Sequence, residues 1–276
     1  MKVGVIGTGS MGTILIEAFL EAEAIKQEEL FVTNRTIDKA FRLKERYNDI
    51  HVVDLWTVVE ETDLFFLCTK PKQMPDVIKQ IAPHCRKEQI LISITSPISV
   101  EQIERIIDCK VARAIPSILN RARSGASLLS FGKRCDKKDR KMITDLMASI
   151  SEPLVIEENI TRVSSDIVSC GPAFFSFLVQ QFIDAAVRQT DISKEDATTL
   201  ATNMLIGLGT LLEKGYYTLP TLQKRVCVPG GITGEGIKVL EEEIGGMFDR
   251  LFTRTHQKYE QEKAEIEPMF RDEKVK

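Results

Sequence analysis

The sequence predicts an α/β protein in which a doubly wound, Rossmann-type sheet is followed by an all-α C-terminal domain. The first observation is an apolar run, a glycine turn and an amphipathic segment, in that order, over residues 1–20. The second is the alternation of short apolar runs with helical segments as far as residue 156, which is typical of a parallel sheet. From residue 160 the apolar residues recur at three- and four-residue spacing, which indicates helices. We therefore expect two domains, residues 1–158 and residues 159–276.

The chain opens with a predicted strand, Val3 to Ile6, that runs directly into Gly7, Gly9 and Gly12. Gly7 can form the tight turn, and Gly9 lets the main chain approach a pyrophosphate. Gly12 permits close contact between the following helix and the strand. Free N–H groups at the start of that helix favour an anion. This order predicts a dinucleotide site, and an incidental glycine turn is the alternative.

Further strands and helices alternate along the first domain. The predicted strands cover residues 30–33, 51–53, 63–68, 89–95, 110–115, 127–131 and 154–156, and the predicted helices cover residues 13–20, 55–61, 75–82, 100–107 and 137–150. In such a sheet, ligands lie beyond the carboxyl ends of the strands. Cys68, Thr69, Lys70 and Pro71 follow a buried strand, so we expect them to face the nicotinamide half of the cofactor, with Lys70 near its ribose or phosphates. An ordinary turn with an exposed lysine is the alternative.

The segment that follows the second strand bears on the choice between NAD and NADP. An NAD-preferring site carries an acid at this position, about twenty residues beyond the glycines, to bind the ribose hydroxyls. Asn34, Arg35 and Thr36 stand there instead. The guanidinium of Arg35 suits the extra 2′-phosphate of NADP. We therefore expect NADP, with NAD as the second cofactor that the site can take.

The overall composition excludes several other classes of protein. The net charge of −3 gives no general attraction to nucleic acid, and the basic residues of positions 133–141 are interrupted by Asp136 and Asp139, which is typical of a solvated helix face. Six scattered cysteines without a CxxC pair indicate free thiols and no metal site. We find no apolar run long enough to span a membrane and no signal peptide, so we expect a cytoplasmic protein.

The helical domain contains two features of interest for a substrate site. Gly171 and Pro172 are expected to interrupt its first helix, because proline cannot donate a helical hydrogen bond. A second turn, Val228 to Thr233, contains a proline and two glycines before a helix. Its exposed N–H groups can bind an anion, and a simple connection between helices is the alternative.

These residues resemble the pyrroline-5-carboxylate reductases, which use NAD(P)H to reduce a cyclic imine to proline. The resemblance covers nearly the whole chain through five ordered motifs: IGTGSMG at Ile6, TNRT at Thr33, TKPKQM at Thr69, GPAF at Gly171 and PGGIT at Pro229. It is greatest to the late-competence-operon branch of that family. The resemblance implies a homodimer formed by the helical domain, with larger rings built from dimers, and a small imine as substrate.

The resemblance also implies roles for individual residues. The cofactor would be bound by Gly7, Gly9, Ser10, Met11, Gly12, Asn34, Arg35, Thr36, Lys70 and Pro71, together with Cys68 from the strand order. The imine would contact Ser169, Cys170 and Gly171, and Gly230, Gly231, Ile232 and Thr233 of the partner subunit. Thr233 is the hydroxyl that we assign to the reaction.

Departures from the family pattern lie on the substrate side. Thr95-Ser96-Pro97 replaces the usual AAG, Ile115 to Leu119 replaces MPNTP, and Val168 to Phe174 replaces SGSGPAY. Val228 stands where a hydroxyl is usual. Because a buried carboxylate needs donors, these changes should weaken binding of the usual substrate. Two hypotheses follow, an NADP-preferring imine reductase and a non-catalytic NADP-binding regulator that has lost the substrate pocket.

Overall fold

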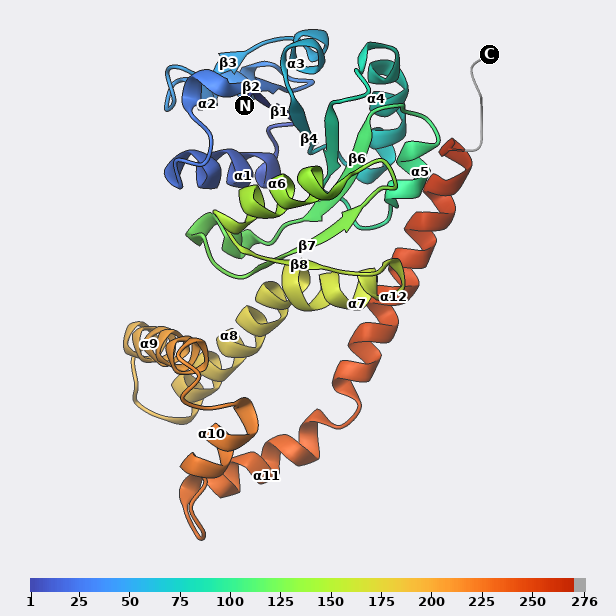
Figure 1. Cartoon of the computed structure of the whole chain (residues 1–276). Coiled ribbons are helices and arrows are strands. Elements are labelled where there is room, and N and C mark those ends of the chain that lie inside the picture. The colour runs from blue at the N-terminus through green and yellow to red at the C-terminus, as the bar shows by residue number, and fades with distance from the viewer. Residues whose placement is uncertain (271–276) are drawn as a thin grey trace. The chain divides into compact units, whose positions relative to one another are not determined.

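The computed structural model describes residues 1–270 and contains one eight-stranded sheet followed by a series of helices (Figure 1). The strand order is β3-β2-β1-β4-β5-β6-β7-β8, and every neighbouring pair is parallel except β6 and β7. The strands are β1 (Val3–Ile6), β2 (Leu30–Thr33), β3 (His51–Val52), β4 (Leu64–Leu67), β5 (Ile90–Ser93), β6 (Lys110–Ile115), β7 (Ala126–Phe131) and β8 (Glu152–Val155). The predicted doubly wound sheet is confirmed. The antiparallel direction of β7 is not predicted from the sequence.

Helices connect the strands and then continue alone. They are α1 (Ser10–Glu21), α2 (Asp38–Lys44), α3 (Leu55–Glu61), α4 (Met74–Ile81), α5 (Val100–Glu104), α6 (Lys137–Ala148), α7 (Thr161–Ser165), α8 (Gly171–Gln189), α9 (Lys194–Glu213), α10 (Leu219–Val226), α11 (Ile232–Ile244) and α12 (Met247–Ile266). No strand of the described chain follows β8, as the helical spacing predicts. Helix α2 is not predicted from the sequence, because only Ala40 and Leu43 of its seven residues are buried.

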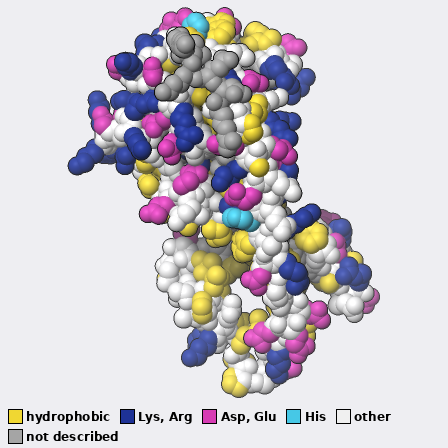
Figure 2. All heavy atoms as spheres, turned by 90° about the vertical axis from the view of Figure 1, so that its right-hand side faces the viewer, with side chains coloured by type: hydrophobic (Ala, Val, Ile, Leu, Met, Phe, Trp, Pro, Cys, Tyr) yellow, Lys and Arg dark blue, Asp and Glu magenta, His cyan; other side chains and the backbone are white. Residues whose placement is uncertain are grey.

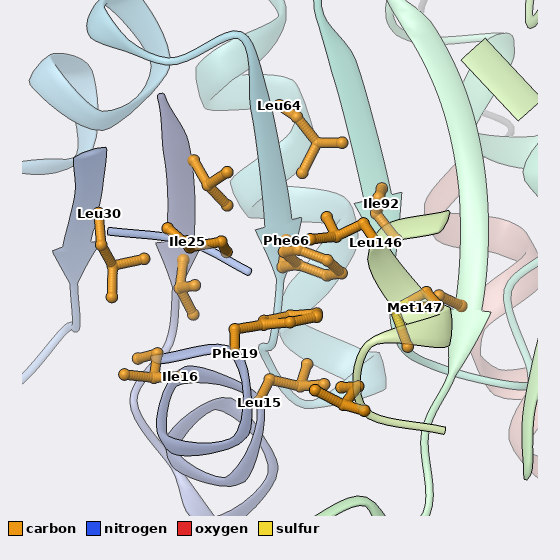
Figure 3. Packing of buried hydrophobic residues seen from close by; sticks show 14 of the residues in the cluster. Leu15, Ile16, Phe19, Ile25, Leu30, Leu64, Phe66, Ile92, Leu146 and Met147 are labelled. Atoms are coloured by element: carbon orange, nitrogen blue, oxygen red, sulfur yellow. The ribbon is translucent and has the colours of Figure 1, made fainter. Parts of the chain in front are cut away.

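Strand β4 lies in the middle of the sheet, and its residues are apolar on both faces because each face packs into a core. Leu64 and Phe66 pack into the core beneath α1 and α6, where the rings of Phe19 and Phe66 lie 5.5 Å apart (Figure 3). Phe65 and Leu67 pack into the opposite core with α3, α4 and α5. Because side chains alternate along a strand, a strand covered on both faces needs an uninterrupted apolar run.

The reversal of strand order occurs at β1. Its neighbours are β2 on one side and β4 on the other, with Ile6 paired to both Thr33 and Leu67. The loops that leave these strands diverge to opposite faces, which opens a crevice at their carboxyl ends. Three of the sequence motifs therefore meet at one edge of the sheet.

Arg113 of β6 is fully buried, at 0% exposed. Its guanidinium donates hydrogen bonds to the carbonyl oxygens of Ser96 (3.2 Å) and Ile98 (3.3 Å), the hydroxyls of Ser130 (3.3 Å) and Thr161 (2.8 Å), and the carboxylate of Glu158 (2.7 Å). A buried charge needs such partners, because its desolvation costs several kcal/mol. Arg113 thus ties the loop after β5 to the segment that leads into α7.

The C-terminal end of α12 also packs on the sheet domain. Ile266 is fully buried in the core with α4 and α5, and Phe270 is 7% exposed there. The sequence predicts that Pro268 ends the last helix and leaves a frayed tail. Helix α12 does end just before Pro268, at Ile266, and a 3₁₀ turn over Glu267–Phe270 follows it. Residues 271–276 of that predicted tail lie outside the described residues.

The chain divides into two compact units. One contains residues 1–172 and the C-terminal segment from Thr255, and the other contains Ala173–Arg254. The second unit buries only a small apolar cluster, centred on Ile183, Ala197 and Ala201. The domain limits 1–158 and 159–276 follow from the change of pattern in the sequence and stay a proposal.

The helical unit exposes an extensive apolar surface, part of which is visible in Figure 2. Phe175, Phe177 and Phe182 of α8 are 61%, 63% and 67% exposed, and Leu200 and Ile206 of α9 are 62% and 64% exposed. A large exposed apolar surface of this kind marks an interaction site.

The continuous helical stretch Glu158–Gln189 corrects an expectation from the sequence. By length and composition it is apolar enough to cross a membrane, whereas the sequence predicts no apolar run of that length. The interruption expected at Gly171 and Pro172 affects the regular α-helix alone: a π-helical segment, Asp166–Cys170, separates α7 from α8, and the chain stays helical throughout. One helix of this kind is weak evidence for a membrane, since apolar helices of subunit interfaces have the same composition.

Candidate cofactor site

The glycine turn between β1 and α1 has a conformation that side chains would prevent. Gly7 has a φ of +107°, and a Cβ added to it would lie 2.7 Å from the carbonyl oxygen of Cys68. A Cβ on Gly12 would lie 2.0 Å from the carbonyl oxygen of Gly7, so helix and turn touch through their backbones. Gly9 has open space around it and caps α1 without a side-chain hydrogen bond. The turn therefore leaves the helix N-terminus accessible to an anion.

The loop after β2 is joined to this turn by Asn34. The Thr8 N–H donates to the Asn34 Oδ1 (3.1 Å), and the Asn34 Nδ2 donates to the Thr36 carbonyl oxygen (2.9 Å). The sequence predicts that Asn34 binds the cofactor, whereas here its amide positions the two loops against each other. Arg35 is exposed and lines the same crevice without an ion pair to any described residue.

A cleft of about 860 Å³ lies at the carboxyl ends of β1, β2 and β4. This volume is within the range of pockets that hold cofactors. It is lined by Ile6, Gly7, Gly9, Thr33, Asn34, Arg35, Thr36, Ile37, Lys39, Val52, Val53, Asp54, Leu55, Cys68, Thr69, Lys70, Gln73, Val77 and Gln80. Three cationic side chains and one carboxylate are among these residues, which favours an anionic ligand.

Seven of the predicted cofactor residues line this cleft: Gly7, Gly9, Asn34, Arg35, Thr36, Cys68 and Lys70. Gly12 shapes the turn from behind, and Ser10 and Met11 form the first turn of α1. Pro71 begins a 3₁₀ turn, Pro71–Gln73, beside the cleft. Burial raises the pKa of the Cys68 thiol to about 12, so this cysteine is a neutral side chain at the cleft and not a nucleophile.

Lys39, Asp54 and Gln80 line the cleft but are not predicted from the sequence. Lys39 was missed together with helix α2. Asp54 follows β3, and the rule that ligands lie beyond the carboxyl ends of parallel strands could have indicated it. Gln80 lies near the end of α4, and no sequence signal distinguishes it from other exposed residues of that helix.

The predicted substrate residue Ser169 lies in the π-helical segment that precedes Pro172. Pro172 has no N–H, so it cannot donate to the carbonyl oxygen of Val168, four residues earlier. The Ser117 hydroxyl donates to that oxygen instead (2.8 Å), and the Ser169 hydroxyl donates to the Pro116 carbonyl oxygen (2.9 Å). Both hydroxyls thus join the loop after β6 to the π-helical segment.

A cation lies next to Cys170, the second predicted substrate residue. The Arg162 guanidinium donates to the Asp166 carboxylate (2.7 Å) and to the Cys170 sulfur (3.5 Å). Thr255 of α12 donates to the other oxygen of the Asp166 carboxylate (2.7 Å). Burial raises the pKa of the Cys170 thiol, so this side chain stays neutral near neutral pH.

The turn over Val228 to Thr233 lies in the helical unit. Gly230 has a φ of +71°, and Gly231 caps α11 without a side-chain hydrogen bond. Ile232 is 93% exposed, and Thr233 is exposed in the first turn of the helix. The residues assigned to the partner's side of the substrate site are therefore all at the surface.

No group of three or more His, Cys, Asp or Glu side chains that could hold a metal ion occurs within residues 1–270. The six cysteines are free thiols, as their spacing predicts. The polar groups of the cleft instead fit a dinucleotide: glycines that leave room for backbone contact, an open helix N-terminus, and cations beyond the second strand.

Known proteins share these features over the whole chain. Residues 158–262 match the family model of pyrroline-5-carboxylate reductase dimerisation, and residues 2–97 match that of NADP oxidoreductase, coenzyme F420-dependent. ComE operon protein 4 of Bacillus subtilis is 52% identical over 271 residues, which cover 98% of this chain and 99% of that protein. Pyrroline-5-carboxylate reductase 3 of the same organism is 28% identical over 260 residues, which cover 94% of this chain and 96% of that protein. The chain belongs to the pyrroline-5-carboxylate reductase family.

Its similarity to ComE operon protein 4 confirms the predicted competence branch of that family. Solved structures of pyrroline-5-carboxylate reductases have the same fold. The Plasmodium falciparum enzyme with NADP bound is 22% identical, with a TM-score of 0.81 and 98% of each chain covered. The Streptococcus pyogenes enzyme is 19% identical, with a TM-score of 0.82, and covers 96% of this chain. This family member thus has an NAD(P) oxidoreductase fold and carries the family's dimerisation domain.

Proposed function

We propose that this chain is an NADPH-preferring reductase of a cyclic imine. The observation that carries the proposal is the cleft at the carboxyl ends of β1, β2 and β4, where a glycine turn and the exposed Arg35 occupy one edge of the sheet. When bound there, NADPH would supply a hydride from its nicotinamide C4 to a C=N carbon, while the nitrogen takes up a proton from solvent, so that an amine and NADP⁺ result. The chain's own part is to bind and orient both molecules, because an imine is already polarised.

In this proposal the glycine turn and the start of α1 bind the pyrophosphate. Arg35 binds the 2′-phosphate, and Lys70 contacts the ribose or phosphates of the nicotinamide half. Asn34 joins the glycine turn to the loop that carries Arg35, through its hydrogen bonds to Thr8 and Thr36. Gly12 keeps α1 against the turn, so that its N-terminus stays aimed at the phosphates.

Replacing Arg35 by serine is expected to weaken binding of NADPH about 10-fold and to leave NADH binding unchanged. A hydrogen bond to a charged group contributes about 1.5–3 kcal/mol, and the exposure of Arg35 places the effect at the low end. Fluorescence titration of both cofactors measures it. Arg42→Ser, an exposed arginine of α2 outside the cleft, is the matched control. Equal losses for NADPH and NADH in Arg35→Ser would contradict this role.

On the substrate side, we propose that Thr233 of one subunit donates its hydroxyl to the imine bound by the other. Gly171 borders the same substrate, and Cys170, Gly230, Gly231 and Ile232 surround it. The Ser169 hydroxyl already donates to the Pro116 carbonyl oxygen, so in this proposal Ser169 positions the residues beside it and donates no hydrogen bond to the substrate. The pocket therefore offers fewer hydrogen-bond donors to a substrate carboxylate than the usual residues of the family would offer.

Steady-state oxidation of NADPH, with pyrroline-5-carboxylate beside other cyclic imines, tests the function. We expect turnover of at least one imine and a decrease in kcat/KM of about 10- to 100-fold in Thr233→Ala, the range for losing a hydrogen bond to a charged group. Thr198→Ala is the control, because Thr198 is exposed on α9 and donates only within its own helix. A purified protein that neither binds nor oxidises NADPH would rule the proposal out.

A second candidate function is a non-catalytic, NADP-binding regulator. The observation that favours it is the commitment of the Ser117 and Ser169 hydroxyls to main-chain oxygens, which leaves few polar groups for a substrate. Binding of NADPH without turnover of any cyclic imine in the same assay would support this function over the first.

We further propose that the protein is a cytoplasmic homodimer without a nucleic-acid or membrane partner. The match of residues 158–262 to a dimerisation model and the exposed phenylalanines of α8 support the dimer. Burying such side chains contributes about 25 cal/mol per Å² of apolar surface. Rings of several dimers, as the resemblance implies, belong to the same proposal.

A further inference from the structure

The structure contains two buried hydroxyls without partners near the cofactor cleft. The Oγ1 atoms of Thr8 and Thr69 accept and donate no hydrogen bond among the described residues. They lie just beyond the carboxyl ends of neighbouring strands, since Ile6 of β1 pairs with Leu67 of β4. Buried polar groups in native proteins are almost always paired, so an unpaired hydroxyl needs an explanation.

The two threonines differ in their relation to the cleft. Thr69 lines it, between Cys68 and Lys70, whereas Thr8 is 6% exposed and does not. A rotation of about 120° about χ1 of Thr69 moves its hydroxyl to the position of the methyl group or of the hydrogen on Cβ, and it requires no backbone movement. A ligand in the cleft can therefore pair with a hydroxyl that has no partner in its present rotamer.

We infer that the Thr69 hydroxyl binds the dinucleotide, by donating a hydrogen bond to a phosphate or ribose oxygen of its nicotinamide half. The hydroxyl is unpaired before the cofactor binds and paired afterwards. This inference rests on the proposed function, because it requires a dinucleotide in the cleft. The proposed role of Thr69 differs from that of Arg35, because the nicotinamide half that Thr69 would contact is the same in NADPH and NADH.

A single substitution, Thr69→Val, tests the inference by two measurements, because it should weaken cofactor binding without lowering the thermal stability of the free protein. Valine keeps the shape of threonine and removes the hydroxyl. In fluorescence titrations the Kd for NADPH is expected to rise about 2- to 12-fold for a hydrogen bond to a ribose oxygen, and more for one to a charged phosphate oxygen. The Kd for NADH should rise by the same factor. The thermal unfolding midpoint of the free protein should stay equal or rise, because an unpaired buried hydroxyl has been removed.

Thr62→Val is the matched control. Thr62 is fully buried outside the cleft, and its hydroxyl donates to the Val58 carbonyl oxygen at 2.7 Å. The same chemical change should therefore lower the unfolding midpoint of the free protein and leave the Kd for NADPH unchanged.

The outcomes separate this inference from the proposed function. Wild-type protein that binds no NADPH would overturn both. Wild-type protein that binds NADPH, with an unchanged Kd in Thr69→Val, would overturn the inference alone. A lower unfolding midpoint of free Thr69→Val would also overturn it, because the hydroxyl would then be paired without the cofactor.

Discussion

Replacing Gly12 by alanine should lower the free energy of unfolding by about 3 kcal/mol and weaken NADPH binding at least about 100-fold. The added Cβ would lie 2.0 Å from the Gly7 carbonyl oxygen, a backbone atom that no side-chain rotation can move away. Alanine favours a helix over glycine by about 1 kcal/mol, but the contact costs more than that. Helix α1 must therefore move away from the turn, and its N–H groups lose their aim at the pyrophosphate.

Chemical denaturation and fluorescence titration measure the two effects. Gly9→Ala separates them, because a Cβ at Gly9 has no atom within 4 Å. This variant should unfold like the wild type and still bind NADPH more weakly, since the methyl group lies where the pyrophosphate approaches. A Gly12→Ala protein with wild-type stability would show that the contact between helix and turn relaxes at little cost.

The contrast between these glycines shows what the sequence can predict. The spacing of Gly7, Gly9 and Gly12 after an apolar run indicates their separate roles, because each role depends on local backbone geometry. The strands are predictable for the same reason, since a sheet covered on both faces requires continuous apolar runs such as Leu64 to Leu67. Helix α2 was not predictable, because its few buried residues give a weak periodic signal.

Interactions between segments far apart in the sequence account for what was missed. The motif that contains Asn34 identifies a cofactor loop, but its bond to the Thr8 N–H depends on how two loops meet. Ser169 is predicted to contact the substrate, but its hydroxyl donates to the Pro116 carbonyl oxygen, and the missing N–H of Pro172 leaves the Val168 carbonyl oxygen for Ser117. The burial of Arg113 has no sequence signal, because an arginine inside a strand is usually at the surface.

Replacing Arg113 by methionine is the second change with a large expected effect, a loss of about 2–3 kcal/mol in the free energy of unfolding. Methionine fills much of the volume but leaves the carbonyl oxygen of Ile98 without a donor, while that of Ser96 keeps only the Tyr259 hydroxyl, at 3.3 Å. Glu158 is about half-exposed, so its own loss of a partner is screened by solvent and contributes little. The unpaired Ile98 carbonyl oxygen and the weakened hydrogen bonding of Ser96 therefore dominate the cost.

Denaturant unfolding of Arg113→Met beside Arg105→Met distinguishes a buried charge network from a surface ion pair. Arg105 pairs with Glu101 at 3.8 Å on the exposed side of α5, and both side chains are more than half exposed. Its replacement should change the free energy of unfolding by less than about 0.5 kcal/mol. Similar losses in the two variants would mean that water replaces the Arg113 network. A large loss in Arg113→Met alone would establish that the bonds of this arginine, from the loop after β5 to the segment before α7, contribute to stability.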